Sequence, residues 1–199
     1  MVIVALGDST TAGTPAFQSP LEAPPDGRGD VTSQYAYWLM QQHRDWRVLN
    51  RGVNGERSDQ ISARFDRDVL QHQPNVVVII AGVNDVYQGR PVAGVIQQLR
   101  AMYVRARQAH IPVVAGSIIP YNTATPEQNA KMREINAWIA GEAARDLGVT
   151  FVDTRKAAAS ADSIDRLAGS PDGLHPDVAG HRRMAEAIAP ALQALVATR

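Results

Sequence analysis

The feature that most restricts the fold is an alternation of short apolar segments with longer segments of helical periodicity. Continuous apolar segments are typical of strands covered on both faces, as in a parallel sheet. Five of them are predicted as strands: Val2–Leu6, Arg47–Asn50, Val76–Ala81, Val113–Ser117 and Thr150–Val152. Strands that alternate with helices predict an α/β fold of three layers around a parallel sheet. With 199 residues, no internal repeat and no linker, the chain is expected to form one domain, 1–199.

Helical periodicity predicts five longer helices. Three of them are Tyr35–His43, Pro91–His110 and Val178–Val196. Another follows Ser58, which is expected to cap it, and the fifth continues to Leu147 from a capping box at Thr125 to Gln128. The stretch Thr14–Ser33 is rich in Pro, Gly and acidic residues and is predicted to be an irregular loop. Loops of this length are usually functional or mobile, so it is either a lid, an interface, a specificity element or a disordered surface loop.

Charge and composition exclude several classes of protein. The chain has 20 basic and 20 acidic residues and no Cys. A net charge of zero argues against a nucleic-acid partner, and the lack of Cys excludes disulfides, thiolate zinc sites and a Cys nucleophile. The longest apolar run, Val76–Ala81, is too short for a transmembrane span. Because the chain begins with a strand rather than a leader, we expect a cytoplasmic protein, with a leader removed from a longer precursor as the alternative.

Reactive side chains are expected just after the strands, because ligands of open α/β sheets bind outside the carboxyl ends of the strands. Polar and small residues gather there: Gly7-Asp8-Ser9, Arg51 to Gly55, Gly82 to Asp85, Ile118 to Asn122, the loop at Asp153 and the loop Asp172 to His175. Ser9 stands at a strand-to-helix turn, where backbone N–H groups favour a developing anion. It is therefore a candidate nucleophile, although Ser is also a common N-cap.

A serine nucleophile needs a base, and His175 is the best candidate of the five histidines. Asp172 lies three residues upstream, so one loop can present both side chains, with the carboxylate fixing the imidazole tautomer. The alternative is that Asp172 caps a turn and His175 lies on the surface. The other histidines are expected to be structural or surface residues, or lie within the last helix: His43, His72, His110 and His181.

Acyl transfer also requires donors for an oxyanion. The candidates are the backbone N–H of Ser9, the backbone N–H of Gly55 and the side-chain amide of Asn84. Gly and Asn are common turn residues, so each alone is weak. Together with the nucleophile and the base, however, all of them fall at predicted strand ends.

These residues resemble the four sequence blocks of the SGNH (GDSL-type) hydrolase family. The blocks occur in order as Gly7-Asp8-Ser9, Asn50 to Gly55, Gly82 to Asp85 (Gly-x-Asn-Asp), and Asp172 to Pro176 (Asp-x-x-His). Gly55 matches the family's oxyanion glycine, with Gly52 as the neighbouring possibility. Two departures are visible: Thr10 replaces the Leu of the family's name, and Thr14–Ser33 enlarges the loop beside the nucleophile.

The resemblance implies a flavodoxin-like sheet with strand order 2-1-3-4-5 and a serine hydrolase that needs neither metal nor cofactor. Its catalytic residues would be Ser9, Asp172 and His175, with Ser9, Gly55 and Asn84 as the oxyanion hole. The residues expected to line the cleft follow strand ends: Asp8, Val86, Tyr87, Pro120, Tyr121 and Asn122. Tyr and Asn there suit a polar or sugar-like leaving group, and the sequence does not indicate the continuous apolar groove that a long acyl chain needs. We therefore expect short acyl esters as substrates, including acetyl groups on small molecules or carbohydrates.

Several alternatives stay open at this point. A thioesterase or a lysophospholipase would use the same scaffold. A nucleotide-binding α/β protein or a non-catalytic carbohydrate-binding relative would belong to another class. A metal cluster of Asp8, Asp172, His175 and Asp177 is possible from residue types alone. The sequence does not indicate an oligomeric state.

Overall fold

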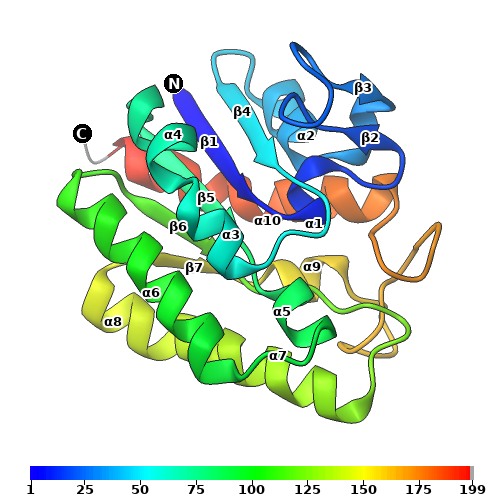
Figure 1. Cartoon of the computed structure of the whole chain (residues 1–199). Coiled ribbons are helices and arrows are strands. Elements are labelled where there is room, and N and C mark those ends of the chain that lie inside the picture. Colours follow the sequence, from blue (N-terminus) through cyan, green and yellow to red (C-terminus); the bar gives the residue numbers. More distant parts are fainter. Residues whose placement is uncertain (198–199) are drawn as a thin grey trace.

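A five-stranded parallel sheet lies at the centre of the structure, a computed structural model that describes residues 1–197 (Figure 1). Its strands are β1 (Val2–Gly7), β4 (Arg47–Gly52), β5 (Val76–Ile80), β6 (Val113–Gly116) and β7 (Thr150–Val152). They are arranged in the order β4-β1-β5-β6-β7. Counted along the chain, this is the expected order 2-1-3-4-5, so the predicted fold class is confirmed.

The register aligns the carboxyl ends of β1, β4 and β5 at the same edge of the sheet. Gly7 at the end of β1 pairs with Gly52 of β4 on one side and with Ile80 of β5 on the other. The connections that follow these strands therefore begin at the same level. A Cβ on Gly52 would lie 2.1 Å from the backbone nitrogen of Ala12, so only glycine lets the chain after β1 approach β4 this closely.

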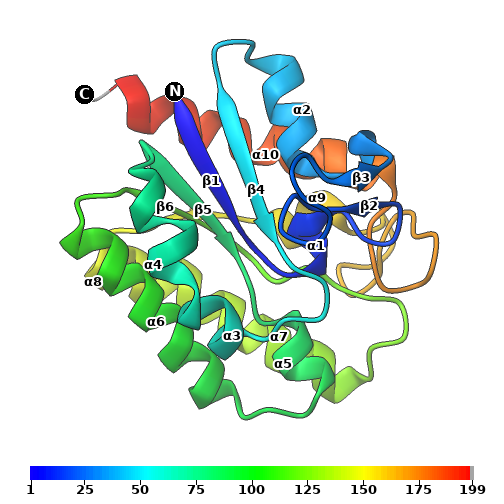
Figure 2. The same ribbon diagram turned by 45° about the horizontal axis from the view of Figure 1, so that its top comes forward.

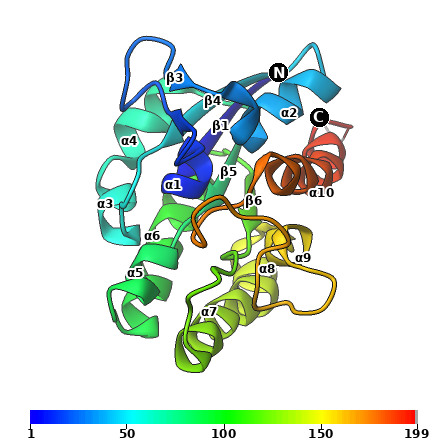
Figure 3. The same ribbon diagram turned by 90° about the vertical axis from the view of Figure 1, so that its right-hand side faces the viewer.

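Helices cover both faces of the sheet, as Figure 3 shows with the sheet between two layers. One layer contains α3 (Ser58–Ala63), α4 (Phe65–Asp68), α6 (Val92–Gln108), α7 (Pro126–Trp138) and α8 (Ala144–Leu147). The other contains α2 (Tyr35–Gln42), α9 (Thr154–Ala158) and α10 (Val178–Ala197). Two short helices, α1 (Ser9–Ala12) and α5 (Val83–Tyr87), follow β1 and β5 directly.

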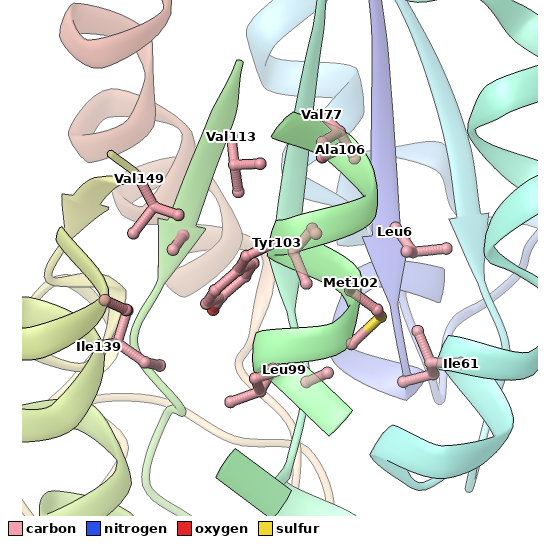
Figure 4. Close-up of a cluster of buried hydrophobic side chains, with 14 of the residues drawn as sticks. Leu6, Ile61, Val77, Leu99, Met102, Tyr103, Ala106, Val113, Ile139 and Val149 are labelled. Atoms are coloured by element: carbon pink, nitrogen blue, oxygen red, sulfur yellow. The ribbon is translucent and has the colours of Figure 1, made fainter. Parts of the chain in front are cut away.

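Alternate residues of each central strand enter two separate hydrophobic clusters. Val4 and Leu6 of β1 join the cluster under α3, α4, α6 and α7, whereas Ile3 and Ala5 join the cluster under α2 and α10. Figure 4 shows the first cluster, in which side chains of α6 point toward the sheet. Burial on both faces explains why the strands are continuously apolar, since neither face meets water.

Two predicted helices are interrupted in the structure. The segment after Ser58 is divided into α3 and α4 at Arg64, and η2 (Leu70–His72) follows. The segment after Thr125 has the expected capping box but contains a π-helical turn, η3 (Ile139–Ala143), before α8. Ser58 is the first residue of α3 and not its N-cap, which is Arg57, and both its backbone N–H and its hydroxyl donate to the Asp85 carboxylate, each at 2.8 Å.

The stretch Thr14–Ser33 contains more structure than the sequence indicates. Strands β2 (Phe17–Gln18) and β3 (Arg28–Gly29) pair antiparallel, and a 3₁₀ turn, η1 (Val31–Ser33), follows. Figure 2 shows this hairpin next to α1 and β4. Of the helices within residues 1–197, none combines the length and the hydropathy that a membrane crossing requires.

Candidate active site

The predicted site residues converge at the carboxyl ends of β1, β4 and β5. A hollow of about 140 Å³ lies there, lined by Ser9, Thr10, Asn54, Val83, Asn84, Tyr87, Tyr121, Leu174 and His175. These residues come from α1, α5 and three loops, which the sheet register brings to one level. Figure 3 shows the loop before α10 beside α1, although the two are far apart in the sequence.

Ser9 is the first residue of α1, and its backbone N–H lies in the first turn, where no carbonyl of the helix can accept it. The N-cap is Asp8, whose carboxylate accepts the N–H of Thr10 at 3.0 Å. Ser9 is therefore not the cap, the alternative that the sequence left open. Its side chain is free to face the hollow.

His175 joins the predicted nucleophile to the predicted acid. Its Nε2 lies 2.9 Å from Ser9 Oγ, and its Nδ1 lies 2.7 Å from Asp172 Oδ2. The other carboxylate oxygen of Asp172 accepts the backbone N–H groups of Leu174 and His175, each at 2.9 Å. One carboxylate thus shapes the turn and orients the ring that the turn carries.

The ionised form of Asp172 is favoured in this turn. Its partial burial raises the pKa of the carboxyl, but the hydrogen bonds from the His175 ring and from the two backbone N–H groups outweigh burial and hold the pKa below its usual value. A carboxylate that stays ionised next to Nδ1 keeps the proton on that nitrogen. Nε2 is then available as an acceptor facing Ser9.

The other four histidines have different surroundings from those of His175. His43 ends α2 and stacks on Trp46, and His72 bonds with the Arg51 guanidinium. His110 follows α6 with a φ of 56°. His181 is fully buried in α10, and burial lowers its pKa to about 3, so its ring is neutral at physiological pH.

Of the three predicted oxyanion donors, Ser9 and Asn84 line the hollow, whereas Gly55 follows the lining residue Asn54. The Nδ2 of Asn84 donates one hydrogen to the Glu56 carbonyl at 2.9 Å, which orients the amide and leaves the second hydrogen unused. Gly55 adopts a φ of 77° in the turn after β4, next to the lining residue Asn54. Gly52 instead ends β4 and is buried against α1, so Gly55 is the better placed of the two glycines.

Asp85, the last residue of the third block, has a role that the sequence does not indicate. Both oxygens of its buried carboxylate accept hydrogen bonds from Ser58, one from the backbone N–H and one from the hydroxyl, each at 2.8 Å. Burial raises the pKa of Asp85, although these hydrogen bonds oppose the shift. The residue therefore ties α5 to the start of α3, and no signal of spacing or periodicity predicts a cap from another element.

The residues expected to line the cleft divide into two groups. Tyr87 and Tyr121 line the hollow, and their rings meet edge to face with centroids 5.8 Å apart. The others face elsewhere. Val86 is buried in the hydrophobic core, and Asp8 and Pro120 are also buried. Asn122 binds neighbouring loops, with its N–H donating to the Gly173 carbonyl and its side-chain oxygen accepting from Leu167.

Asp8 is a carboxyl group buried inside the protein. It is 1% exposed, and burial raises its pKa to about 7, while hydrogen bonds from Thr10 oppose the shift. Its Oδ2 has no hydrogen-bond partner among residues 1–197. In the same part of the chain, no group of three His, Asp or Glu side chains is arranged to hold a metal ion.

Comparison with known proteins assigns the family. The model of the GDSL-like lipase/acylhydrolase family matches residues 5–183. An acetylxylan esterase from Geobacillus stearothermophilus is 27% identical over 154 residues, which cover 71% of this chain and 69% of that protein. Esterase TesA from Pseudomonas aeruginosa is 27% identical over 161 residues, which cover 79% of this chain and 75% of that protein.

The fold comparison agrees with the sequence comparison. The crystal structure of a member of the lipolytic protein G-D-S-L family from Veillonella parvula superposes with a TM-score of 0.77, covering 97% of this chain and 98% of that one at 19% identity. The family model covers most of the chain and includes the four sequence blocks. The chain therefore belongs to the GDSL-like lipase/acylhydrolase family and is a hydrolase that acts on ester bonds.

Proposed function

We propose that the protein is a serine esterase that removes short acyl groups, acetyl among them, through an acyl-enzyme on Ser9. The observation that carries the proposal is the position of the His175 ring, with Nε2 2.9 Å from Ser9 Oγ and Nδ1 2.7 Å from Asp172. These distances are within the range in which a positioned base takes a proton from a nucleophile.

The proposed reaction has two steps. Ser9 Oγ attacks the acyl carbon while His175 Nε2 takes the hydroxyl proton, and the carbonyl oxygen becomes an oxyanion. The ester C–O bond then breaks as His175 returns the proton to the leaving alcohol. In the second step, water loses a proton to His175 and attacks the acyl-enzyme, and Ser9 leaves with that proton.

The oxyanion is proposed to bind three donors: the N–H of Ser9, the N–H of Gly55 and the free amide hydrogen of Asn84. The first two lie in a helix start and a turn, so neither needs to break an internal hydrogen bond to meet the substrate. Donors that are already oriented stabilise the transition state without reorganisation.

The size of the hollow favours a short acyl group. At about 140 Å³, it is well below the roughly 300 Å³ at which pockets begin to enclose drug-sized ligands. Its apolar lining residues, Val83 and Leu174, suit a methyl or short alkyl group, and the two tyrosines suit a polar leaving group. Similarity to an acetylxylan esterase also supports acetyl transfer from a hydroxylated substrate.

The test compares p-nitrophenyl acetate, butyrate and octanoate as substrates for wild type and for Ser9→Ala, with circular dichroism as the folding control. We expect hydrolysis that falls steeply from butyrate to octanoate and that Ser9→Ala abolishes. Activity that survives in folded Ser9→Ala would refute the nucleophile. Higher kcat/KM on octanoate than on acetate would refute the short-acyl assignment and favour a lysophospholipase or thioesterase.

A further inference from the structure

Arg64 joins the end of β1 to the end of β4 and to the turn that follows β4, the two chain segments that carry Ser9 and Gly55. It lies at the break between α3 and α4 and is 9% exposed. Its Nη2 donates to the Gly7 carbonyl at 2.9 Å, and its Nη1 donates to the Arg51 carbonyl at 2.9 Å. Its Nε donates to the Glu56 carboxylate at 2.7 Å.

Each of these acceptors lies within a few residues of one proposed donor. Gly7 ends β1 directly before Asp8 and Ser9. Arg51 precedes the turn that contains Gly55. The backbone carbonyl of Glu56 accepts the Asn84 amide at 2.9 Å, so holding Glu56 also orients Asn84.

The geometry explains why this position needs an arginine. The guanidinium presents donors in a fixed plane, and Arg64 directs them to two strand ends and a loop at once. A lysine ammonium is a single point charge, which cannot reach three separated acceptors with the same geometry. The Gly7 carbonyl also accepts the N–H of Val53 at 3.2 Å, so Arg64 supplies its second donor and uses both lone pairs of that oxygen.

The charge of Arg64 is balanced locally. Glu56 binds Nε at 2.7 Å, and Asp68 binds Nη1 at 2.8 Å. Two carboxylates beside one guanidinium leave no excess positive charge to stabilise an oxyanion at a distance. Arg64 is also not among the residues that line the hollow. Its contribution is therefore geometric.

We infer that Arg64 is a positioning residue, which sets the relative placement of Ser9, Gly55 and Asn84 as one oxyanion hole. The inference rests on the proposed function of those three donors. Displacing donors of this kind by a fraction of an ångström weakens transition-state binding more than ground-state binding, so the effect belongs in kcat.

The test is Arg64→Lys, with Arg105→Lys as the matched control. Arg105 also donates to a carbonyl of α3, Ser62 at 2.7 Å, but its other partners are Asp66 and the Phe65 ring, none of them in the hollow. On p-nitrophenyl acetate, we expect Arg64→Lys to lower kcat by about 10- to 100-fold, part of the roughly 10²–10³ that one lost donor costs. KM should stay within about two-fold, and Arg105→Lys should retain wild-type kcat.

Inhibition by methylboronic acid separates positioning from loss of folded protein. The boronate adds to a serine hydroxyl and forms a tetrahedral anion like the one that acetyl transfer passes through. A partly unfolded sample would lose kcat but keep the inhibition constant of its folded fraction. We expect Arg64→Lys to weaken that constant in parallel with kcat, and unchanged inhibition would overturn the inference.

Glu56→Gln gives a second variant in case Arg64→Lys does not fold. It removes the charged partner of Arg64 Nε and keeps the backbone carbonyl that orients Asn84. We expect a smaller loss of kcat, with weaker boronate inhibition, and wild-type values for both would overturn the inference. Ser9→Ala distinguishes failure of the proposed function from failure of the inference about Arg64. If Ser9→Ala remains active, the proposed function fails. If Ser9→Ala is inactive but the Arg64 and Glu56 variants behave as wild type, only the inference fails.

Discussion

At the scale of single residues, the site depends on side chains whose separate atoms have separate tasks. One oxygen of Asp172 closes the turn through two backbone N–H groups, and the other binds the His175 ring. Asn84 likewise donates one amide hydrogen to the Glu56 carbonyl, and the other is the hydrogen proposed to bind the oxyanion. Such division fixes the orientation of the reactive atom, because the side chain cannot rotate without losing its structural bond.

Asn84→Ala tests the residue-scale proposal for the oxyanion hole. We expect the variant to fold and to lose roughly 10²–10³ in kcat, as for the loss of one oxyanion donor. Steady-state kinetics on p-nitrophenyl acetate measures the loss. Asn75→Ala is a matched control, since Asn75 accepts the N–H of Val2 at the opposite end of β1. Near-normal kcat in folded Asn84→Ala would remove the amide from the mechanism.

Asp8 should make stability depend on pH. The pKa of its carboxyl is raised from 3.8 to about 7, so the folded protein binds this proton more tightly than the unfolded chain does. Asp8 therefore lowers the free energy of unfolding as the pH rises from about 4 to 7, by on the order of 4 kcal/mol if the whole shift is realised. Below pH 4 both states are protonated, and this destabilisation is absent.

Urea unfolding of wild type and Asp8→Asn at several pH values between 4.5 and 8 measures that effect. Asparagine keeps an oxygen for the Thr10 N–H and cannot ionise. We expect wild type to lose stability relative to Asp8→Asn as the pH rises, since contributions of all other groups cancel in the difference. Parallel stability profiles for the two proteins would contradict the raised pKa.

At the scale of elements, the sequence predicts those strand bounds and helix caps that local sequence patterns determine. Each of the five strands of the parallel sheet lies within two residues of its predicted bounds, and the capping box at Thr125 is present, because apolar runs and caps are local signals. The break between α3 and α4 is not predictable in this way. Arg64 bonds with Gly7 and Arg51, which are 57 and 13 residues away, so its conformation depends on the assembled sheet.

The insertion Thr14–Ser33 also depends on tertiary contacts. Its two strands have two residues each, too few to show a period of two. The hairpin is fixed by Ser19, whose buried hydroxyl donates to the Gly52 carbonyl at 2.6 Å. Glu22 adds a second link, since its carboxylate accepts the N–H groups of Ser19 and Asn54, each at 2.9 Å.

Glu22→Ala tests whether this insertion supports the turn that carries Gly55. The N–H of Asn54 would lose its acceptor, and the turn beside the hollow would become less well placed. We expect kcat on p-nitrophenyl acetate to fall by about 10-fold, since small misplacements cost up to 10²-fold. The melting temperature should change little, and Asp26→Ala, which removes an exposed carboxylate of the same insertion, should retain wild-type kcat. Equal kcat values for Glu22→Ala and Asp26→Ala would contradict the view that the insertion supports this turn.

At the scale of the whole molecule, sequence blocks predict which residues meet but not how side chains are turned. Ser9 and His175 are 166 residues apart, and their places after predicted strand ends, together with the family's sequence blocks, predicted that they meet. The lining residues required more. Val86 and Tyr87 are neighbours in α5, yet one is buried in the core and the other is 56% exposed beside the hollow. The rotation of a five-residue helix follows from the residues packed around it, which no local pattern contains.

A substitution in the core, outside the hollow, should change stability without changing activity, and Tyr103 offers a test. It lies on α6 and is 1% exposed in the hydrophobic core, where its ring stacks on Trp138. Its hydroxyl has no hydrogen-bond partner among residues 1–197. A buried polar group without a partner costs about 1–3 kcal/mol, so Tyr103→Phe should raise the free energy of unfolding by an amount near the lower end. The ring and its contacts are kept, and kcat should not change because Tyr103 does not line the hollow.

Tyr35→Phe is the matched comparison, because the equally buried hydroxyl of Tyr35 lies 3.2 Å from Thr11 Oγ1. Removing it should lower stability by about 1 kcal/mol, the net worth of a typical hydrogen bond. Urea unfolding midpoints at constant slope measure both variants. The prediction is the opposite sign of the two shifts. A loss of stability in Tyr103→Phe would mean that its hydroxyl does find a partner in solution, such as a buried water.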